Sequence, residues 1–96
     1  MSKLTLKPPS DTQIEAALLA VTNARGLGAS ACPSEVARKL RPDTWRELMP
    51  SIRRVAAKLA QRGRLEITQG GSVVVPKEPF KGPIRVRQCK TPPSDS

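Results

Sequence analysis

Two cationic side chains, Arg54 and Lys58, lie four residues apart in a segment whose apolar residues recur at helical spacing. Side chains at this spacing share one face of a helix, so the pair can meet phosphates, and an arginine can also bind O6 and N7 of guanine with two hydrogen bonds. The alternative is an ordinary solvated face, as most charged helix faces are. We expect a nucleic-acid-binding face on a helix over residues 50–62, formed by Ser51, Arg53, Arg54, Lys58 and Gln61.

A second group of candidate contacts lies in the C-terminal half of the chain. Gly70 and Gly71 form a two-residue turn, and Arg85 and Arg87 share one face of an alternating segment. These residues could extend the contact along a phosphate backbone, where each neutralised phosphate releases counterions. For the two arginines, the alternative is an ordinary cross-strand pair with Glu66.

The residue types that most enzymatic chemistry needs are missing or isolated. The chain has no histidine, which excludes Ser-His-Asp triads, Cys-His dyads and His-ligated zinc. Ser34 lacks the downstream lysine of an acyl-enzyme motif, and Cys32 and Cys89 are too far apart for a C-x-x-C pair. Cys32 precedes a short helix, where it is either a reactive thiolate or a small buried hydrophobic residue. We expect no enzyme, and no metal, cofactor or small-molecule substrate.

Composition favours a polyanionic partner. The 96 residues carry 17 Lys and Arg against 8 Asp and Glu, a net charge of +9, and residues 33–64 hold nine of these cations against three acids. This excess favours nucleic acid or an anionic lipid surface as the partner. Because Trp45 and Phe80 are the only aromatic residues, few bases could stack on the protein, which favours duplex DNA over single strands. We expect Trp45 to anchor the core.

The length fits one small domain. We expect it to cover residues 10–88, between disordered tails at residues 1–9 and 89–96, which contain prolines and little apolar surface. The longest apolar run, residues 16–21, is far shorter than the roughly 18 residues that span a bilayer. The N-terminus also lacks the apolar region of a secretory signal. A cytoplasmic protein without membrane contact is the expectation.

Capping signals predict the first two helices. The first begins at Ser10, whose S-x-x-Q spacing fits a capping box, and ends before Gly26, which can adopt the left-handed conformation. After a short extended link, the second helix covers residues 33–40. Pro33 suits its first position because the missing N–H would be unpaired there.

A third helix is predicted after a separate helical turn. The T-x-x-E spacing at Thr44 predicts that turn, and Pro50 then opens the helix, which runs to Arg62 before Gly63. The core should form where the apolar faces of the helices meet. Its expected members are Ile52, Val55 and Leu59 against Ile14, Leu18 and Val21, completed by Val36 and Leu40.

The remaining segments predict a small sheet and with it the fold class. Residues 65–69 and 72–75 flank the Gly-Gly turn as a hairpin, and residues 83–88 alternate as a further strand. Three helices followed by a hairpin predict an α+β winged helix-turn-helix. In that fold the third helix enters the major groove of DNA, and the hairpin is a wing beside it.

Four motifs carry a resemblance to a known family. They are Cys32-Pro33-Ser34-Glu35-Val36-Ala37-Arg38, Trp45-Arg46-Glu47-Leu48-Met49-Pro50, Gly63-Arg64-Leu65-Glu66-Ile67-Thr68-Gln69 and Gly82-Pro83-Ile84-Arg85-Val86-Arg87. In this order they resemble the bacterial family "domain of unknown function 3253" over nearly all of residues 12–88. The resemblance implies a winged-helix-like fold and a bacterial source, and it supplies no catalytic residue.

These observations together predict a non-enzymatic, basic module that binds duplex DNA through the helix over residues 50–62 and the wing. The alternative is a protein interaction module whose basic face binds an acidic partner, since winged helices also serve in protein contacts.

Overall fold

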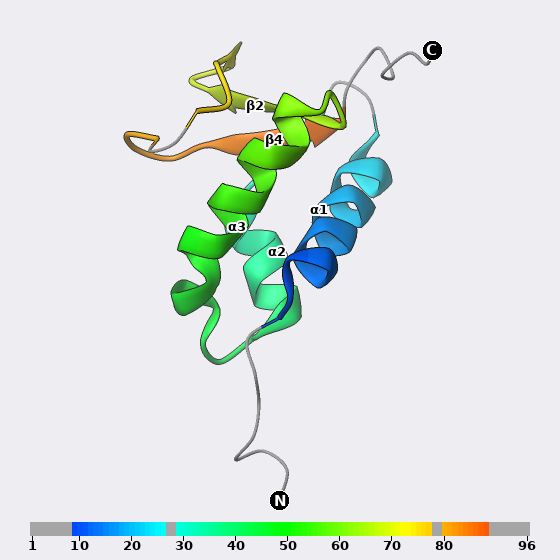
Figure 1. Ribbon diagram of the computed structural model, residues 1–96, viewed down its shortest axis with the longest axis vertical. Coiled ribbons are helices and arrows are strands. Elements are labelled where there is room, and N and C mark those ends of the chain that lie inside the picture. Colours follow the sequence, from blue (N-terminus) through cyan, green and yellow to red (C-terminus); the bar gives the residue numbers. More distant parts are fainter. Residues whose placement is uncertain (1–8, 27–28, 78–79, 89–96) are drawn as a thin grey trace, which may run out of the picture.

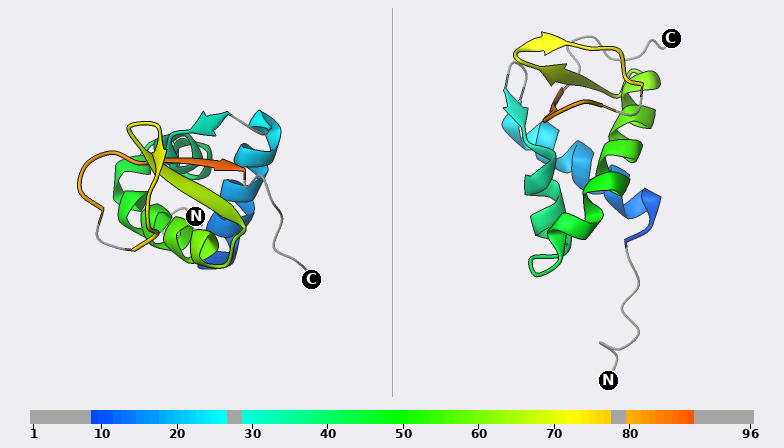
Figure 2. Two further views of the ribbon diagram at one scale, coloured as in Figure 1. Left: turned by 90° about the horizontal axis from the view of Figure 1, so that it is seen from above. Right: turned by 90° about the vertical axis from the view of Figure 1, so that its left-hand side faces the viewer.

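The computed structural model describes residues 9–26, 29–77 and 80–88. Of the two predicted tails, only Pro9 lies within these ranges. The described residues form an α+β structure of three helices and a four-stranded antiparallel sheet, which lies across one end of the helices (Figures 1 and 2). The elements in chain order are α1 (Asp11–Arg25), β1 (Ser30–Ala31), α2 (Pro33–Leu40), α3 (Trp45–Gln61), β2 (Leu65–Gln69), β3 (Ser72–Val73) and β4 (Arg85–Gln88).

The sheet brings distant segments together. Its strand order is β1-β4-β2-β3, so the last strand lies between the first strand and the hairpin. Val86 is the partner of both Ala31 in β1 and Ile67 in β2, and all three side chains are buried. Since side chains alternate along a strand, this row fixes which face of the sheet packs on the helices.

The first two helices begin and end as their local signals predict. In α1, the Ser10 side chain accepts from the backbone N–H of Gln13, and the Gln13 side chain accepts from the backbone N–H of Ser10, so the capping box is complete. Gly26 ends this helix as expected, but its φ of 84° and ψ of 177° lie outside the left-handed helical region that the sequence predicts, in a conformation that still favours glycine. Pro33 is the first residue of α2.

The predicted start of the third helix is wrong. Helix α3 is continuous from Trp45 with Pro50 inside it, and the Thr44 side chain makes no capping hydrogen bond. Pro50 is exposed, whereas Leu48 and Ile52 on either side of it are buried. Burial of a large aliphatic side chain is worth about 1.5–3 kcal/mol, so the two together offset the roughly 3 kcal/mol that proline costs within a helix.

Pro50→Ala is therefore expected to stabilise the protein. Alanine supplies the N–H that proline lacks and removes the ring from the preceding turn, a gain of up to about 3 kcal/mol. Alanine also has more conformational freedom than proline in the unfolded chain, which lowers this gain in stability by about 0.4–1 kcal/mol. Urea denaturation should show a free energy of unfolding higher by about 1–2 kcal/mol. A lower value would indicate that Pro50 opens a separate helix, where proline is favoured.

One hydrophobic core joins the three helices to the sheet. The predicted members are confirmed as buried, except that Leu40 is partly buried against the core. Trp45 also packs against the core from its edge. The strands contribute Ala31, Leu65, Ile67 and Val86, and Ile84 lies just before β4.

Candidate nucleic-acid interface

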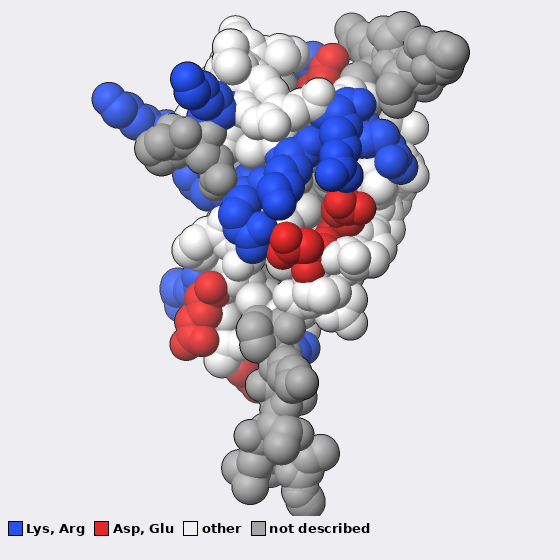
Figure 3. Space-filling model, viewed as in Figure 1, with Lys and Arg blue, Asp and Glu red and all other residues white. Residues whose placement is uncertain are grey.

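Cations gather in a band along α3. Arg54, Lys58 and Arg62 follow one another at four-residue spacing, so they lie along one side of this helix and its C-terminal cap. We call these three residues the α3 band. Figure 3 shows Lys and Arg side chains in a strip over α3, with acidic side chains directly beside it. Arg54 and Arg62 pair with two acids of α1, Asp11 and Glu15, which also lie four residues apart.

Arg54 is held by the first residue of α1. Its Nη1 donates to Oδ2 of Asp11 at 2.8 Å, and its Nη2 donates to Oδ1 at 3.1 Å, so the two groups meet as a bidentate pair. The hydrogen bond from Arg54 lowers the pKa of the Asp11 carboxyl, and the charges of Arg54 and Lys58 lower this pKa further, against an opposing effect of desolvation. Asp11 is therefore ionised at neutral pH. We expected Arg54 to lie on the solvent face, but it is half-buried and forms an ion pair with Asp11.

The rest of the α3 band is less constrained. Arg62 is 3.5 Å from Glu15, the longest of the four ion pairs found among the described residues. Lys58 lies between the two paired arginines and is exposed. In the part of the chain that the structure describes, it makes no ion pair or side-chain hydrogen bond. Lys58 is thus the cation of the α3 band most available to a phosphate.

Arg53 and Gln61 face the segment that follows β3. Arg53 donates to the carbonyl oxygens of Gly82 at 2.9 Å and Phe80 at 3.4 Å. Gln61 donates to the carbonyl oxygen of Pro76 at 2.7 Å. Both side chains therefore hold the chain between the hairpin and β4 against α3. Ser51, the remaining candidate on this helix, is half-buried.

The glycine turn lies at the exposed end of the hairpin. Gly70 and Gly71 have φ of 57° and 86°, the positive values that a two-residue hairpin turn requires. The predicted hairpin is confirmed, although β3 is only two residues long. The turn exposes backbone rather than charge.

The two arginines of β4 form hydrogen bonds with neighbouring strands of the sheet. Arg87 is half-buried and its Nε donates to Oε1 of Glu66 at 2.7 Å, directly across the strands, so the alternative of a cross-strand pair is confirmed at this residue. Arg85 is exposed and binds Ser30 of β1, with Nε 2.6 Å from Oγ and Nη2 3.2 Å from the carbonyl oxygen. Both arginines therefore have their hydrogen-bond partners within the sheet.

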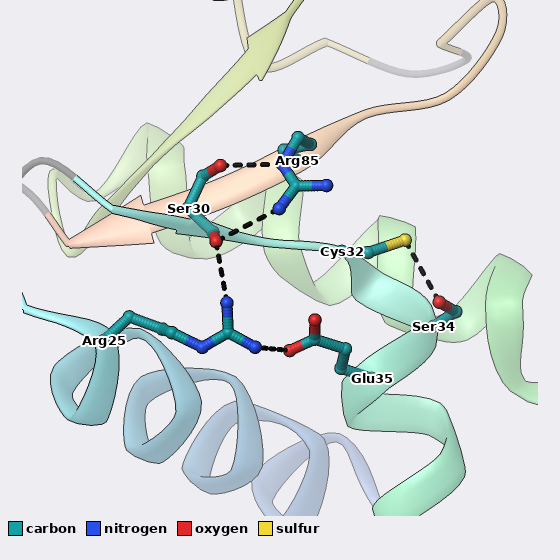
Figure 4. A network of polar contacts seen from close by, with 6 residues as sticks. All are labelled: Arg25, Ser30, Cys32, Ser34, Glu35 and Arg85. Atoms are coloured by element: carbon teal, nitrogen blue, oxygen red, sulfur yellow. Dashed lines mark hydrogen bonds and ion pairs between the residues drawn. The ribbon is translucent and has the colours of Figure 1, made fainter.

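A polar network joins this edge of the sheet to the helices (Figure 4). Arg25 of α1 donates to the same Ser30 carbonyl oxygen at 3.1 Å and pairs with Glu35 of α2. Cys32, at the start of α2, is half-buried, and the Ser34 hydroxyl donates to its sulfur at 3.0 Å. Among the described residues there is no cluster of three potential metal ligands.

Sequence reasoning missed the acidic partners of the α3 band. The signal was present, since residues 11 and 15 have the same four-residue spacing as the cations. What the sequence does not give is the alignment of α1 beside α3, which places residue 11 against residue 54.

Two comparisons with known proteins bear on this chain. The model of a family described as "Protein of unknown function (DUF3253)" matches residues 11–89. None of the curated proteins compared with the chain matches it. No helix in the described ranges is both long and apolar enough to cross a membrane.

Proposed function

The chain belongs to the DUF3253 family of proteins of unknown function, and we propose that it is a winged-helix module that binds duplex DNA in the cytoplasm without catalysing a reaction. Helix α3 is the element that enters the major groove, and the β2–β3 hairpin is the wing. The observation that carries this proposal is the α3 band, in which exposed Lys58 lies between two arginines.

The topology supports the winged-helix assignment. A short strand separates α1 from α2, and a tight connection joins α2 to α3. The hairpin and β4 then complete an antiparallel sheet in which β4 pairs with β1. In DNA-binding proteins with a helix-turn-helix, the second helix of the motif enters the major groove. Here that helix is α3.

The charge distribution supports a phosphate backbone as the partner. The net charge is +9, and α3 contributes four cations against one acid. Phosphate contacts fix the position of a protein on DNA, and a cationic helix face supplies them. Lys58 can serve this role without breaking an existing bond.

A protein interaction module is the second candidate, and two observations favour it. Arg54 and Arg62 already bind carboxylates, so carboxylates of an acidic protein could take the same places. The valines that follow the glycine turn are also unusually exposed, at 55% for Val73 and 74% for Val75. Exposed apolar side chains are more useful in a protein contact than on a phosphate backbone.

Titration of the protein into random-sequence duplex DNA at several salt concentrations separates these candidates. Neutralised phosphates release counterions, so the logarithm of the affinity should fall by about 0.9 per contact for each tenfold rise in salt. We expect a slope of at least about two to three, because the α3 band offers three cations. Absence of binding at low salt would leave the protein interaction module as the better explanation.

A further inference from the structure

Two arginines form cation–π contacts with the tryptophan at the start of α3. Trp45 is the first residue of α3, and its ring is half-buried. The Cζ atom of Arg38, from α2, lies 4.5 Å from the ring centroid, and the Cζ atom of Arg46 lies 4.7 Å from it. Both distances are within the roughly 6 Å of a cation–π contact. Trp45 thus does more than anchor the core edge, because it also positions two exposed cations.

The hydrogen-bond donors of these arginines remain available. A guanidinium has five N–H donors, and neither cation–π contact pairs one of them with an acceptor oxygen. Within the described residues, neither Arg38 nor Arg46 forms an ion pair or donates a side-chain hydrogen bond. They differ in this from Arg54 and Arg62, which are occupied by carboxylates of α1.

The local charge is positive but mixed. Between residues 38 and 47 the chain has four cations and two acids, Asp43 and Glu47. The N-terminus of the 17-residue helix α3 adds positive potential, because its first backbone N–H groups lack acceptors within the helix. The planar fork of an arginine matches two oxygens of a phosphate group, a fit that a lysine ammonium lacks.

We propose that Arg38, Trp45 and Arg46 form a second phosphate-binding site, which takes a phosphodiester of the duplex DNA that α3 contacts. This inference rests on the proposed function. Residues 46 and 58 are about 18 Å apart along the helix axis, at about 1.5 Å per residue. At 3.6 residues per turn they are also about a third of a turn apart around it. Duplex DNA covers the axial length in about five base pairs, so a short duplex that lies along α3 can contact the two places with different parts of its backbone.

The fluorescence of Trp45 tests this site directly, because it is the only tryptophan of the chain. Addition of duplex DNA to the full chain should change its emission saturably as the two guanidiniums turn toward phosphate. Arg38→Gln and Arg46→Gln should each reduce this change and lower the salt slope by about one. The matched control is Lys39→Gln, which removes one exposed charge from α2, the helix of Arg38, and leaves both cation–π contacts in place. Thermal unfolding checks that each variant is folded.

The possible outcomes separate the site from the proposed function. If the wild type binds DNA with unchanged Trp45 emission, and Arg38→Gln behaves as Lys39→Gln does, the site is wrong and the proposed function stands. If the wild type binds no duplex, the proposed function is wrong, and inorganic phosphate becomes the second probe. An emission change with phosphate that Arg38→Gln abolishes would support a site for free phosphate, and no change with either probe would overturn both proposals.

Discussion

Leu59→Ala is expected to lower the free energy of unfolding by about 2–5 kcal/mol, the range found for large aliphatic side chains removed from a core. Leu59 is completely buried in α3, in the core that also contains Ile14 and Leu18 of α1. Alanine leaves a cavity that the rigid surroundings fill only in part. Small domains are stable by only about 5–15 kcal/mol, so this single change removes a large share of the total.

Urea denaturation measures this loss as a lower midpoint with an unchanged slope. Val75→Ala is the matched control, since it also shortens an aliphatic side chain, but one that is 74% exposed. Its effect should stay within about 0.5 kcal/mol. A midpoint for Leu59→Ala equal to that of the wild type would contradict the described core.

The sequence predicts the elements whose signals are local. The capping box at Ser10 and the proline at residue 33 set the starts of α1 and α2, because each acts within one turn of helix. The start of α3 does not follow from such a signal. There the local preference of Pro50 for the first turn is outweighed by burial of Leu48 and Ile52, which depends on the other helices.

Contacts between distant segments are likewise predictable only where the sequence carries a local signal for them. The pair of Glu66 with Arg87 is foreseeable, because alternation places both on one face of adjacent strands. Pairing of β1 with β4 joins residues 30 and 87 and has no local signature. The pair of Asp11 with Arg54 likewise depends on how α1 lies beside α3, so the sequence alone predicts the cations of the candidate site but not their counter-charges.

The double variant Arg54→Ala with Lys58→Ala is expected to weaken duplex DNA binding roughly tenfold or more at physiological salt, with a salt slope lower by up to about two. Two cations of the α3 band are removed, and the Asp11 carboxylate is left without the arginine that neutralises it. Stability should change little, because the lost ion pair is open to solvent screening, with 42% of the Arg54 side chain accessible. An affinity and slope equal to those of a wild type that binds DNA would contradict the role of α3.

Removal of a carboxylate of α1 tests the same phosphate contact as removal of the arginine that pairs with it. In the wild type, Asp11 competes with phosphate for Arg54, since Nη1 and Nη2 of that guanidinium already donate to the two carboxylate oxygens of Asp11. Asp11→Asn should therefore tighten DNA binding, because a phosphate no longer competes with this carboxylate for Arg54, and Arg54→Ala in the same chain should cancel this gain. Glu35→Gln is the control, because it removes a carboxylate from the ion pair with Arg25 at the other end of α1. Equal effects of Asp11→Asn and Glu35→Gln would mean that net charge alone sets the affinity and that Arg54 makes no phosphate contact.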